Sequence, residues 1–403
     1  MKILVVCQYY YPEPFRINVI CEKLAARGHE VAVVTGEPNY PEGEIYPGYE
    51  GHSRADELLN GVRVHRCPIA PRKKGAFRRA VNYYSFVRKA KAYINSDKCR
   101  AQDGSDFDIV FIYQLSPVIM ADPALTYKKK HSVPAALYCL DLWPESLIAG
   151  GVKRSSPIFA HYRRSSKRIY RSVDKLFVTS RFFRNYMTEE FGISSERVTY
   201  LPQYAEEIFS DVAPKAEGET VTLVFAGNIG AVQSIDTVLA AAEKLKAEPV
   251  RFIIVGGGSE LERIEREANA KNLGSVEFAG RRPLEEMPKY YSMADAMLIT
   301  LNADPFLSRT LPGKMQSYMA SGRPIIGAID GEAADVIRAA DCGFVGRAED
   351  ADELAGNIMR FVKSPRKAEM GRNSRKYYEE NFEESRFIEK LESELAGLVG
   401  KSQ

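Results

Sequence analysis

The sequence predicts an α/β protein with two successive doubly wound parallel sheets. Three observations predict it: short apolar runs alternate with amphipathic helical stretches, this alternation restarts near the middle of the chain, and glycine-rich turns follow two of the runs. The 403 residues are enough for two or three domains. We expect one domain over residues 1–205, a second over 206–383, and a helix over 384–403 that packs back on the first.

The first domain is expected to open with a β-α-β unit. The apolar run 2–7 predicts a strand, residues 18–27 predict an amphipathic helix that Gly28 can end, and residues 30–35 predict the next strand. Helical stretches separate most of the further strand candidates, which are 62–65, 108–113, 135–140 and 175–179.

The second domain repeats this alternation. Helices are expected over 234–246 and 259–271, and the segment after Glu383 also has helical periodicity. Crossovers between parallel strands are almost always right-handed, which limits the possible topologies. The strand candidates are 220–226, 251–255, 275–279, 296–300 and 324–327.

Composition excludes several classes of protein. Hydrophobic residues make up 45% and charged residues 27%, so the chain is globular and has no room for long disorder. Its six cysteines show no C-x-x-C spacing, so we expect no structural metal and reduced, cytosolic thiols. No apolar run approaches the roughly 20 residues that cross a bilayer, so an integral membrane protein is not expected.

The net charge of +3 hides an asymmetry. Residues 1–205 carry 31 basic and 20 acidic residues, whereas the remainder carries 25 and 33. The first half is therefore expected to face a phospholipid surface, a phosphate-bearing substrate or a nucleic acid. Because no nucleic-acid-binding motif accompanies the charge, nucleic acid is not expected as a partner.

A basic segment over 72–100 holds ten cations against one acid, Asp97, with aromatic residues interleaved. Such a helix can lie in the headgroup layer, where each cation contributes about 1 kcal/mol near an anionic surface. A second basic run over 163–184 supports this hypothesis, while an ordinary solvated helix is the alternative. The expected membrane or lipid contacts are Arg72, Lys73, Lys74, Arg78, Arg79, Arg88 and Lys89.

Glycine turns follow two strands of the second domain, at 226–230 and 255–259. Backbone amides at such turns can receive a phosphate, although a tight turn alone explains them as well. Leu261 occupies the place of the third glycine in G-x-G-x-x-G, which argues against a dinucleotide. Further on, Arg309 and Lys314 flank the start of a helix that Gly322 can end. This pair suits a diphosphate, or is a solvated helix start.

Two carboxylates, Asp141 and Glu145, follow a strand beside the only tryptophan, Trp143. They can supply a base or orient a sugar hydroxyl. The structural alternative is that Asp141 caps a helix and Trp143 fills the core. No histidine has the spacing of a metal ligand or of a catalytic pair.

Together these segments resemble the family 4 glycosyltransferases of the GT-B fold over nearly the whole chain. Leu-Ala-Ala-Arg-Gly-His-Glu-Val at 24–31, the run 224–230 and Tyr-Met-Ala-Ser-Gly-Arg-Pro at 318–324 carry the resemblance. Residues 38–43, 141–146 and 201–206 resemble the branch that builds O-antigen and capsule, including transferases of N-acetylated deoxysugars such as N-acetyl-fucosamine.

The resemblance implies a nucleotide-sugar, usually UDP-linked, bound by the second domain, and an acceptor bound by the first. It implies retention of anomeric configuration with no cofactor and no essential metal. The acceptor would be a polyprenyl-diphosphate-linked or other glycan in bacterial surface polysaccharide synthesis. The protein would then lie in the cytoplasm at the inner face of the plasma membrane.

The chain departs from the family at the donor site. Two glutamates that are usual in the family fall on Arg309 and Ser317, and a usual Arg and Lys appear as Asn228 and Gln233. We expect Arg309 and Lys314 to replace the phosphate clamp, and Glu332 to bind sugar hydroxyls. The expected donor contacts are Arg16, Gly227, Asn228, Gly230, Gly256, Arg281, Arg309, Lys314, Ser317 and Glu332.

For the acceptor hydroxyl, Asp141 is the expected orienting group or base, with Glu145 as the alternative. Arg16 is expected to reach the donor when the two domains close. Two other functions stay open. Because the paired glutamates are absent, the chain could be a non-catalytic nucleotide-sugar-binding scaffold, and a UDP-sugar 2-epimerase would share the fold.

Overall fold

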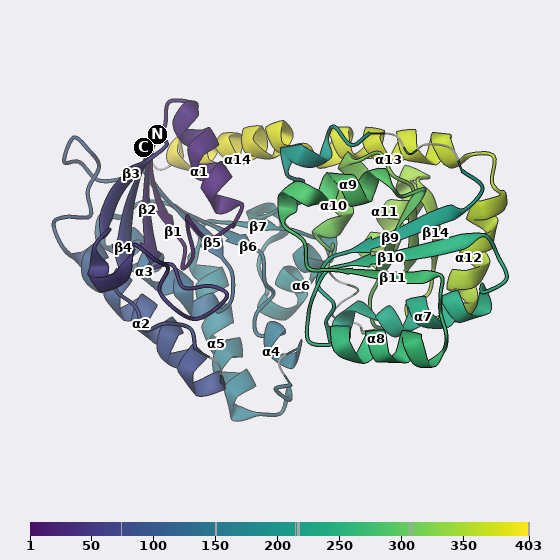
Figure 1. The fold of residues 1–403 in the computed structure, drawn as a ribbon. Helices are drawn as coiled ribbons and strands as arrows, with labels where there is room; N and C mark the ends of the chain where they lie inside the picture. Colours follow the sequence, from purple (N-terminus) through teal and green to yellow (C-terminus); the bar gives the residue numbers. More distant parts are fainter. Residues whose placement is uncertain are drawn as a thin grey trace. The chain divides into compact units, whose positions relative to one another are not determined.

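The computed structural model describes residues 1–73, 75–149, 151–213, 215, 218–304, 306, 308 and 310–401. The chain divides into two compact units, Met1–Leu201 with Ile388–Gln403, and Pro202–Phe387. Each unit is a β-sheet with helices packed against it (Figure 1). This confirms the predicted fold class.

The first unit contains an eight-stranded sheet in which all neighbouring strands but one pair are parallel. The exception is the antiparallel hairpin of the first two strands in the sheet order. That order is β3 (Asp56–Leu59), β4 (Val62–Cys67), β2 (Glu30–Gly36), β1 (Lys2–Val6), β5 (Ile109–Gln114), β6 (Ala135–Cys139), β7 (Lys175–Val178) and β8 (Val198–Tyr200).

Helices pack on both sides of this sheet, with α1 on one side and α2 and α5 on the other (Figure 1). The C-terminal α14 (Glu384–Val399) joins this unit from Ile388 onward, where Glu392 forms ion pairs with Arg27 and His29. The other helices are α1 (Ile17–Ala26), α2 (Ala76–Asn95), α3 (Asp122–His131), α4 (Ser146–Ala149), α5 (Pro157–Ser172) and α6 (Arg181–Phe191).

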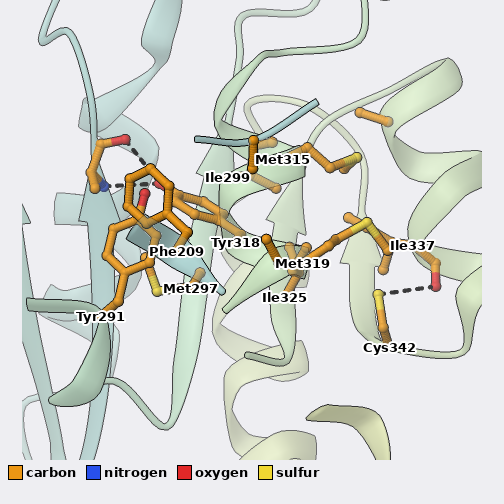
Figure 2. Close-up of a cluster of buried hydrophobic side chains, with 14 of the residues drawn as sticks. Phe209, Tyr291, Met297, Ile299, Met315, Tyr318, Met319, Ile325, Ile337 and Cys342 are labelled. Carbon is orange, nitrogen blue, oxygen red and sulfur yellow. Dashed lines mark hydrogen bonds between the residues drawn. The ribbon is translucent and has the colours of Figure 1, made fainter. Parts of the chain in front are cut away.

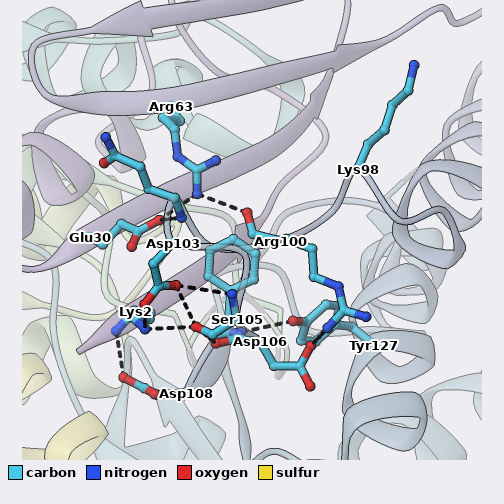
Figure 3. Close-up of polar contacts among 12 residues, drawn as sticks. Lys2, Glu30, Arg63, Lys98, Arg100, Asp103, Ser105, Asp106, Asp108 and Tyr127 are labelled. Atoms are coloured by element: carbon cyan, nitrogen blue, oxygen red, sulfur yellow. Dashed lines mark hydrogen bonds and ion pairs between the residues drawn. The ribbon is translucent and has the colours of Figure 1, made fainter.

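Polar contacts fasten the loop before β5 to the amino ends of the central strands (Figure 3). Lys2 Nζ donates to Asp103 at 2.6 Å, and Arg63 pairs with Glu30 at 2.6 Å. Arg100 pairs with Asp106 in the same group. Each of these three cations at the amino edge of the sheet thus has a carboxylate partner.

The second unit contains a six-stranded, fully parallel sheet. Its order is β11 (Val276–Gly280), β10 (Val250–Val255), β9 (Val221–Ala226), β12 (Ala296–Thr300), β13 (Ile325–Ala328) and β14 (Gly343–Gly346). The helices are α7 (Ile235–Lys244), α8 (Leu261–Ala270), α9 (Met287–Ser292), α10 (Lys314–Ala320), α11 (Glu332–Ala340), α12 (Ala351–Lys363) and α13 (Lys367–Asn381).

The core of the second unit fixes α10 against the end of β9. Tyr318 lies among Tyr291, Met297 and other buried apolar side chains (Figure 2). Its hydroxyl accepts from the Ala226 amide at 2.9 Å and donates to the Ala226 carbonyl at 3.0 Å. Because Ala226 directly precedes the first glycine turn, the core holds the start of α10 beside that turn.

Candidate functional site

The two glycine turns of the second unit pack backbone against backbone. A Cβ on Gly256 would lie 1.8 Å from the Gly227 carbonyl oxygen, and a Cβ on Gly258 would lie 2.2 Å from that of Ile229. Gly227 and Gly256 both have φ of +149°. The glycines are therefore required for the close approach of the loops after β9 and β10, so the tight-turn interpretation holds for them whether or not a ligand binds.

Lys314, the first residue of α10, lies against the first of these turns. Its Nζ donates to Gln233 Oε1 at 2.7 Å and lies 3.8 Å from the centroid of the Phe225 ring. Nζ is also 3.0 Å from the place that a Cβ on Gly227 would take. Within the described part of the chain, no carboxylate lies within 4.0 Å of it.

Burial lowers the pKa of Lys314 from 10.5 to about 7, because the ammonium loses water. A phosphate placed beside this amine would supply the missing negative charge. The amine would then gain a proton as the anion binds.

Three other expected donor residues lie near this amine or at the carboxyl edge of the same sheet. Asn228 lies between the two turns, with its Oδ1 2.9 Å from the place of a Cβ on Gly258. Arg281 is exposed just after β11, and its Cβ is 3.4 Å from the place of a Cβ on Gly257. Glu332 is buried as the first residue of α11, after β13.

Two further donor candidates of this unit, Arg309 and Ser317, are not seen beside the Lys314 amine. Arg309 lies outside the described residues. Ser317 is turned into the core, where its hydroxyl contacts Tyr291 at 3.1 Å and donates to the Lys314 carbonyl at 2.9 Å. These contacts give Ser317 a structural role.

Gln233 and Phe225 were not expected as site residues, yet both contact the Lys314 amine. Thr300 Oγ1 donates to the Gln233 carbonyl at 2.5 Å and so anchors that backbone. The sequence offers a weak signal for Gln233, since it stands where the family has a cation.

In the first unit, Asp141 follows β6 and is bound by residues that follow β5. Ser116 Oγ donates to Asp141 Oδ2 at 2.7 Å, and Trp143 Nε1 donates to Ser116 Oγ at 2.9 Å. Desolvation raises the pKa of Asp141 above its usual value. A carboxyl group with a raised pKa at the carboxyl end of a parallel sheet is suited to proton transfer.

Glu145 is held by other protein groups. Tyr186 donates its hydroxyl to Oε1 at 2.7 Å, and Arg154 lies 3.0 Å from Oε2. Glu145 therefore fastens its loop to α6. Trp143 fills the core against Tyr162, with ring centroids 4.8 Å apart.

Arg16 and Glu13 belong to the loop after β1. Arg16 immediately precedes α1. Burial raises the pKa of Tyr113, and the charge of Arg16 opposes this rise. Glu13, which was not predicted, is fully buried and accepts from the amides of Asn39 at 2.9 Å, Tyr40 at 2.7 Å and Tyr10 at 3.3 Å. It thereby joins the loops after β1 and β2.

The basic segment forms α2 and exposes apolar side chains beside its cations. Phe77 is 80% exposed, and Val81 and Tyr84 lie on the same helix face. The Tyr84 hydroxyl bonds to Tyr162 of α5, and that helix also exposes Ile158. We call Phe77, Val81, Tyr84 and Ile158 the α2–α5 patch. The expected lipid contacts that are exposed near it are Lys73, Arg78, Arg79, Arg88 and Lys89.

Two expected lipid contacts do not belong to this exposed group. Arg72 is half-buried against the Tyr40 ring, at 5.3 Å from its centroid. Lys74 lies outside the described residues.

Among the described residues, no group of three His, Cys, Asp or Glu side chains could hold a metal ion. All six cysteines are buried and free. In the same part of the chain, no helix has the length and apolar character of a membrane span.

Two family models match the chain in succession. The model described as "Glycosyl transferase 4-like domain" matches residues 15–203, and the one described as "Glycosyl transferases group 1" matches residues 207–380. A relative from Escherichia coli (strain K12), WcaI, is named for glycosyl transfer in colanic acid biosynthesis. It is 25% identical over 345 residues, which cover 80% of this chain and 82% of the relative.

Solved structures share the whole architecture. Sucrose-phosphate synthase from Thermosynechococcus elongatus aligns with a TM-score of 0.76 at 17% identity, covering 100% of both chains. HepE from Anabaena, solved with UDP and glucose, aligns with a TM-score of 0.69 at 14% identity over 98% of this chain and 99% of HepE. At such identities the likeness shows the fold alone.

Proposed function

We propose a function from the premise that this chain belongs to the GT-B glycosyltransferases, with a 4-like domain followed by a group 1 domain. It transfers a sugar from a UDP-linked donor, which the second unit binds. The acceptor is a lipid-linked glycan bound by the first unit, and the anomeric configuration is retained. The transferred sugar is N-acetylated, as in the branch that the sequence resembles.

The observation that carries this proposal is Lys314 beside the paired glycine turns. A partly buried amine that no carboxylate of the described residues contacts, next to loops at the carboxyl ends of parallel strands, suits a diphosphate. As the bond from sugar to diphosphate breaks, negative charge grows on the leaving oxygen. Lys314, with Arg281, Arg309 and the amides near Gly230, would stabilise that charge without an essential metal.

Asp141 acts on the acceptor. Its raised pKa, which burial causes, fits a group that orients the acceptor hydroxyl and takes its proton. Glu145, which forms an ion pair with Arg154, is the alternative for this role. Arg16 and Glu332 stay proposed donor contacts.

The α2–α5 patch attaches the protein to the membrane. Its exposed apolar side chains lie beside basic residues, as in helices that bind the surface of an anionic bilayer. Together with the colanic acid role in the relative's name, this supports surface polysaccharide synthesis at the inner face of the plasma membrane.

The test starts with a thermal-shift panel of nucleotides and UDP-sugars in EDTA. A ligand at 100 times its dissociation constant adds about 2.7 kcal/mol of stability. The stabilising UDP-sugar is then incubated with polyprenyl-diphosphate-linked acceptors, and the anomeric proton of the product is examined by NMR. The proposal predicts transfer with retained configuration.

Other outcomes identify the alternatives. Donor binding without transfer to any acceptor would indicate the nucleotide-sugar-binding scaffold. Release of UDP without an acceptor, with a free sugar inverted at its second carbon, would indicate the 2-epimerase. Dependence of transfer on an added divalent metal would contradict the role given to Lys314.

A further inference from the structure

Arg72 lies at a different kind of place from the other cations of the basic segment. Lys73, Arg78 and Arg79 are exposed, whereas Arg72 is half-buried in the loop before α2. Its guanidinium lies 5.3 Å from the centroid of the Tyr40 ring, and its side chain bonds to the Tyr83 hydroxyl. These contacts hold the guanidinium in one place, as a stacked, hydrogen-bonded fork.

Three loops converge on this arginine. The Arg72 amide donates to Asn39 Oδ1 at 2.8 Å. Gly43 approaches so closely that a Cβ there would lie 2.3 Å from the Arg72 carbonyl oxygen. The loops after β1 and β2 and the loop before α2 thus form one structure at the carboxyl edge of the first sheet.

The Tyr40 ring beside the guanidinium belongs to a cluster of three aromatic side chains. Tyr9, Phe15 and Tyr40 form a triangle with centroid distances of 5.4, 5.4 and 5.5 Å. Tyr9 is buried, but Phe15 and Tyr40 are partly exposed. Apolar ring surface beside a few fixed polar groups is typical of small-molecule sites.

The charge of Arg72 has no carboxylate partner in the described part of the chain. Among the described residues, no carboxylate lies within 4.0 Å of its guanidinium. Glu13 already accepts from three amides in the neighbouring loops. Two other arginines of this unit that are not exposed do have such partners. Arg66 pairs with Glu57, and Arg63 pairs with Glu30, the second pair being drawn in Figure 3. A partly desolvated guanidinium without an acidic partner favours an anion brought by a ligand.

We propose that Arg72 binds a phosphate of the acceptor, with Phe15 and Tyr40 covering the adjacent part of that molecule. The acceptor is thereby specified as a lipid-linked phosphate or diphosphate. This inference rests on the proposed function, because it assigns the acceptor to the first unit. The exposed cations of α2 contact the bilayer surface, whereas Arg72 recognises the individual acceptor.

The test measures binding to the full-length chain by calorimetry. The probes are farnesyl diphosphate, farnesol, inorganic pyrophosphate and UDP. Arg72→Met removes the cation, and Arg79→Met is the matched control on the exposed face of α2. We expect Arg72→Met to weaken the binding of farnesyl diphosphate about tenfold or more, which is the usual effect of losing a charged hydrogen bond. Arg79→Met should change it less than twofold, and neither variant should change the binding of farnesol or UDP.

A second variant, Tyr83→Phe, keeps the charge and removes the hydroxyl that bonds to Arg72. This variant should weaken the binding of farnesyl diphosphate several-fold, and it provides the test if Arg72→Met fails to fold. Fluorescence of Trp143, in the same unit, reports whether each variant is folded.

Three results would overturn the inference. Equal affinity of wild type and Arg72→Met for farnesyl diphosphate would remove Arg72 from recognition. Equal weakening by Arg79→Met would show general attraction to the basic helix. Binding of pyrophosphate that is as tight as binding of farnesyl diphosphate would indicate that the ligand of Arg72 is a free diphosphate and not a lipid-linked one. If the wild type does not bind UDP, that separate result contradicts the proposed function.

Discussion

Lys314 combines a partly buried, desolvated amine, which disfavours its charge, with a neighbourhood that suits an anion. Its pKa of about 7 is far below the 10.5 of the unfolded chain. The unfolded state therefore binds the proton more strongly, so this group makes folding stability rise between pH 7 and 10.5. Anion binding depends on pH in the opposite direction and weakens as the pH rises, because the bound diphosphate favours the charged amine.

We therefore predict that UDP binding takes up a proton above pH 7 and weakens as the pH rises. The measurement is calorimetry of UDP binding at pH 8.5 in two buffers of different ionisation enthalpy. Wild type should give different apparent enthalpies, and Lys314→Met should give equal ones. Equal enthalpies for wild type would show that Lys314 does not titrate with the ligand.

Glu13 joins the loops after β1 and β2 of the first unit through three backbone amides. We predict that Glu13→Ala lowers the free energy of unfolding of the first unit by about 2–4 kcal/mol, because these amides lose their acceptor. Denaturant unfolding followed by Trp143 fluorescence measures it. Glu44→Ala, at an exposed residue of the same unit, is the control and should change little. Equal midpoints for the two variants would contradict this role.

The residue-scale contacts were the least predictable from the sequence. Asp141 and Lys314 could be chosen because they adjoin a strand end and a helix start. Glu13 and Arg72 could not be separated from surface charges, because their burial depends on loops that meet only in the fold. Ser317 and Glu145 were expected in the site, but the core and Arg154 engage them.

At the scale of elements, the predicted strands are all present, and most of them are buried apolar runs. β11 is an exception, because none of its residues is fully buried. Three strands were missed. β3 and β14 lack a fully buried run, and β8 has only three residues. A signal for β3 exists in Asn60-Gly61, since both have positive φ and this pair is typical of tight hairpin turns.

The contact between the glycine turns leads to a prediction. Gly256→Ala would place a methyl carbon 1.8 Å from the Gly227 carbonyl oxygen, so the turns must separate. We expect the second unit to lose about 3 kcal/mol or more of stability, and UDP binding with it. Gly274→Ala is the control, because a Cβ there meets nothing within 4 Å. Circular dichroism melting and UDP titration measure both, and a Gly256→Ala protein that binds UDP normally would contradict the packing argument.

The α2–α5 patch gives a prediction for membrane binding. Phe77→Ser with Val81→Ser should reduce sedimentation with phosphatidylglycerol vesicles several-fold, since two exposed apolar anchors are lost. Leu284→Ser, at an exposed apolar residue of the second unit, should leave it unchanged. Higher salt should weaken the remaining charge-driven binding. Binding that is equal in the double variant and the control would exclude the patch.

At the scale of the whole molecule, the fold was predictable because two α/β alternations and their glycine turns are local patterns. The proposed donor site was predictable only in part. Lys314 and the first glycine turn are brought together by the core around Tyr318, which the sequence alone does not show. The net charge differs between the halves of the chain, as expected if the first faces lipid and acceptor phosphates. The family models divide the chain near the same place as its compact units.

The central claim is that the second unit binds the diphosphate of a nucleotide-sugar through Lys314. The most direct measurement is a calorimetric titration of UDP at pH 7 into wild type, Lys314→Met and Lys289→Met, the last at an exposed cation of the same unit. UDP should bind wild type and Lys289→Met equally and should bind Lys314→Met about tenfold or more weakly. UDP binding that is absent from wild type, or unchanged in Lys314→Met, would contradict it.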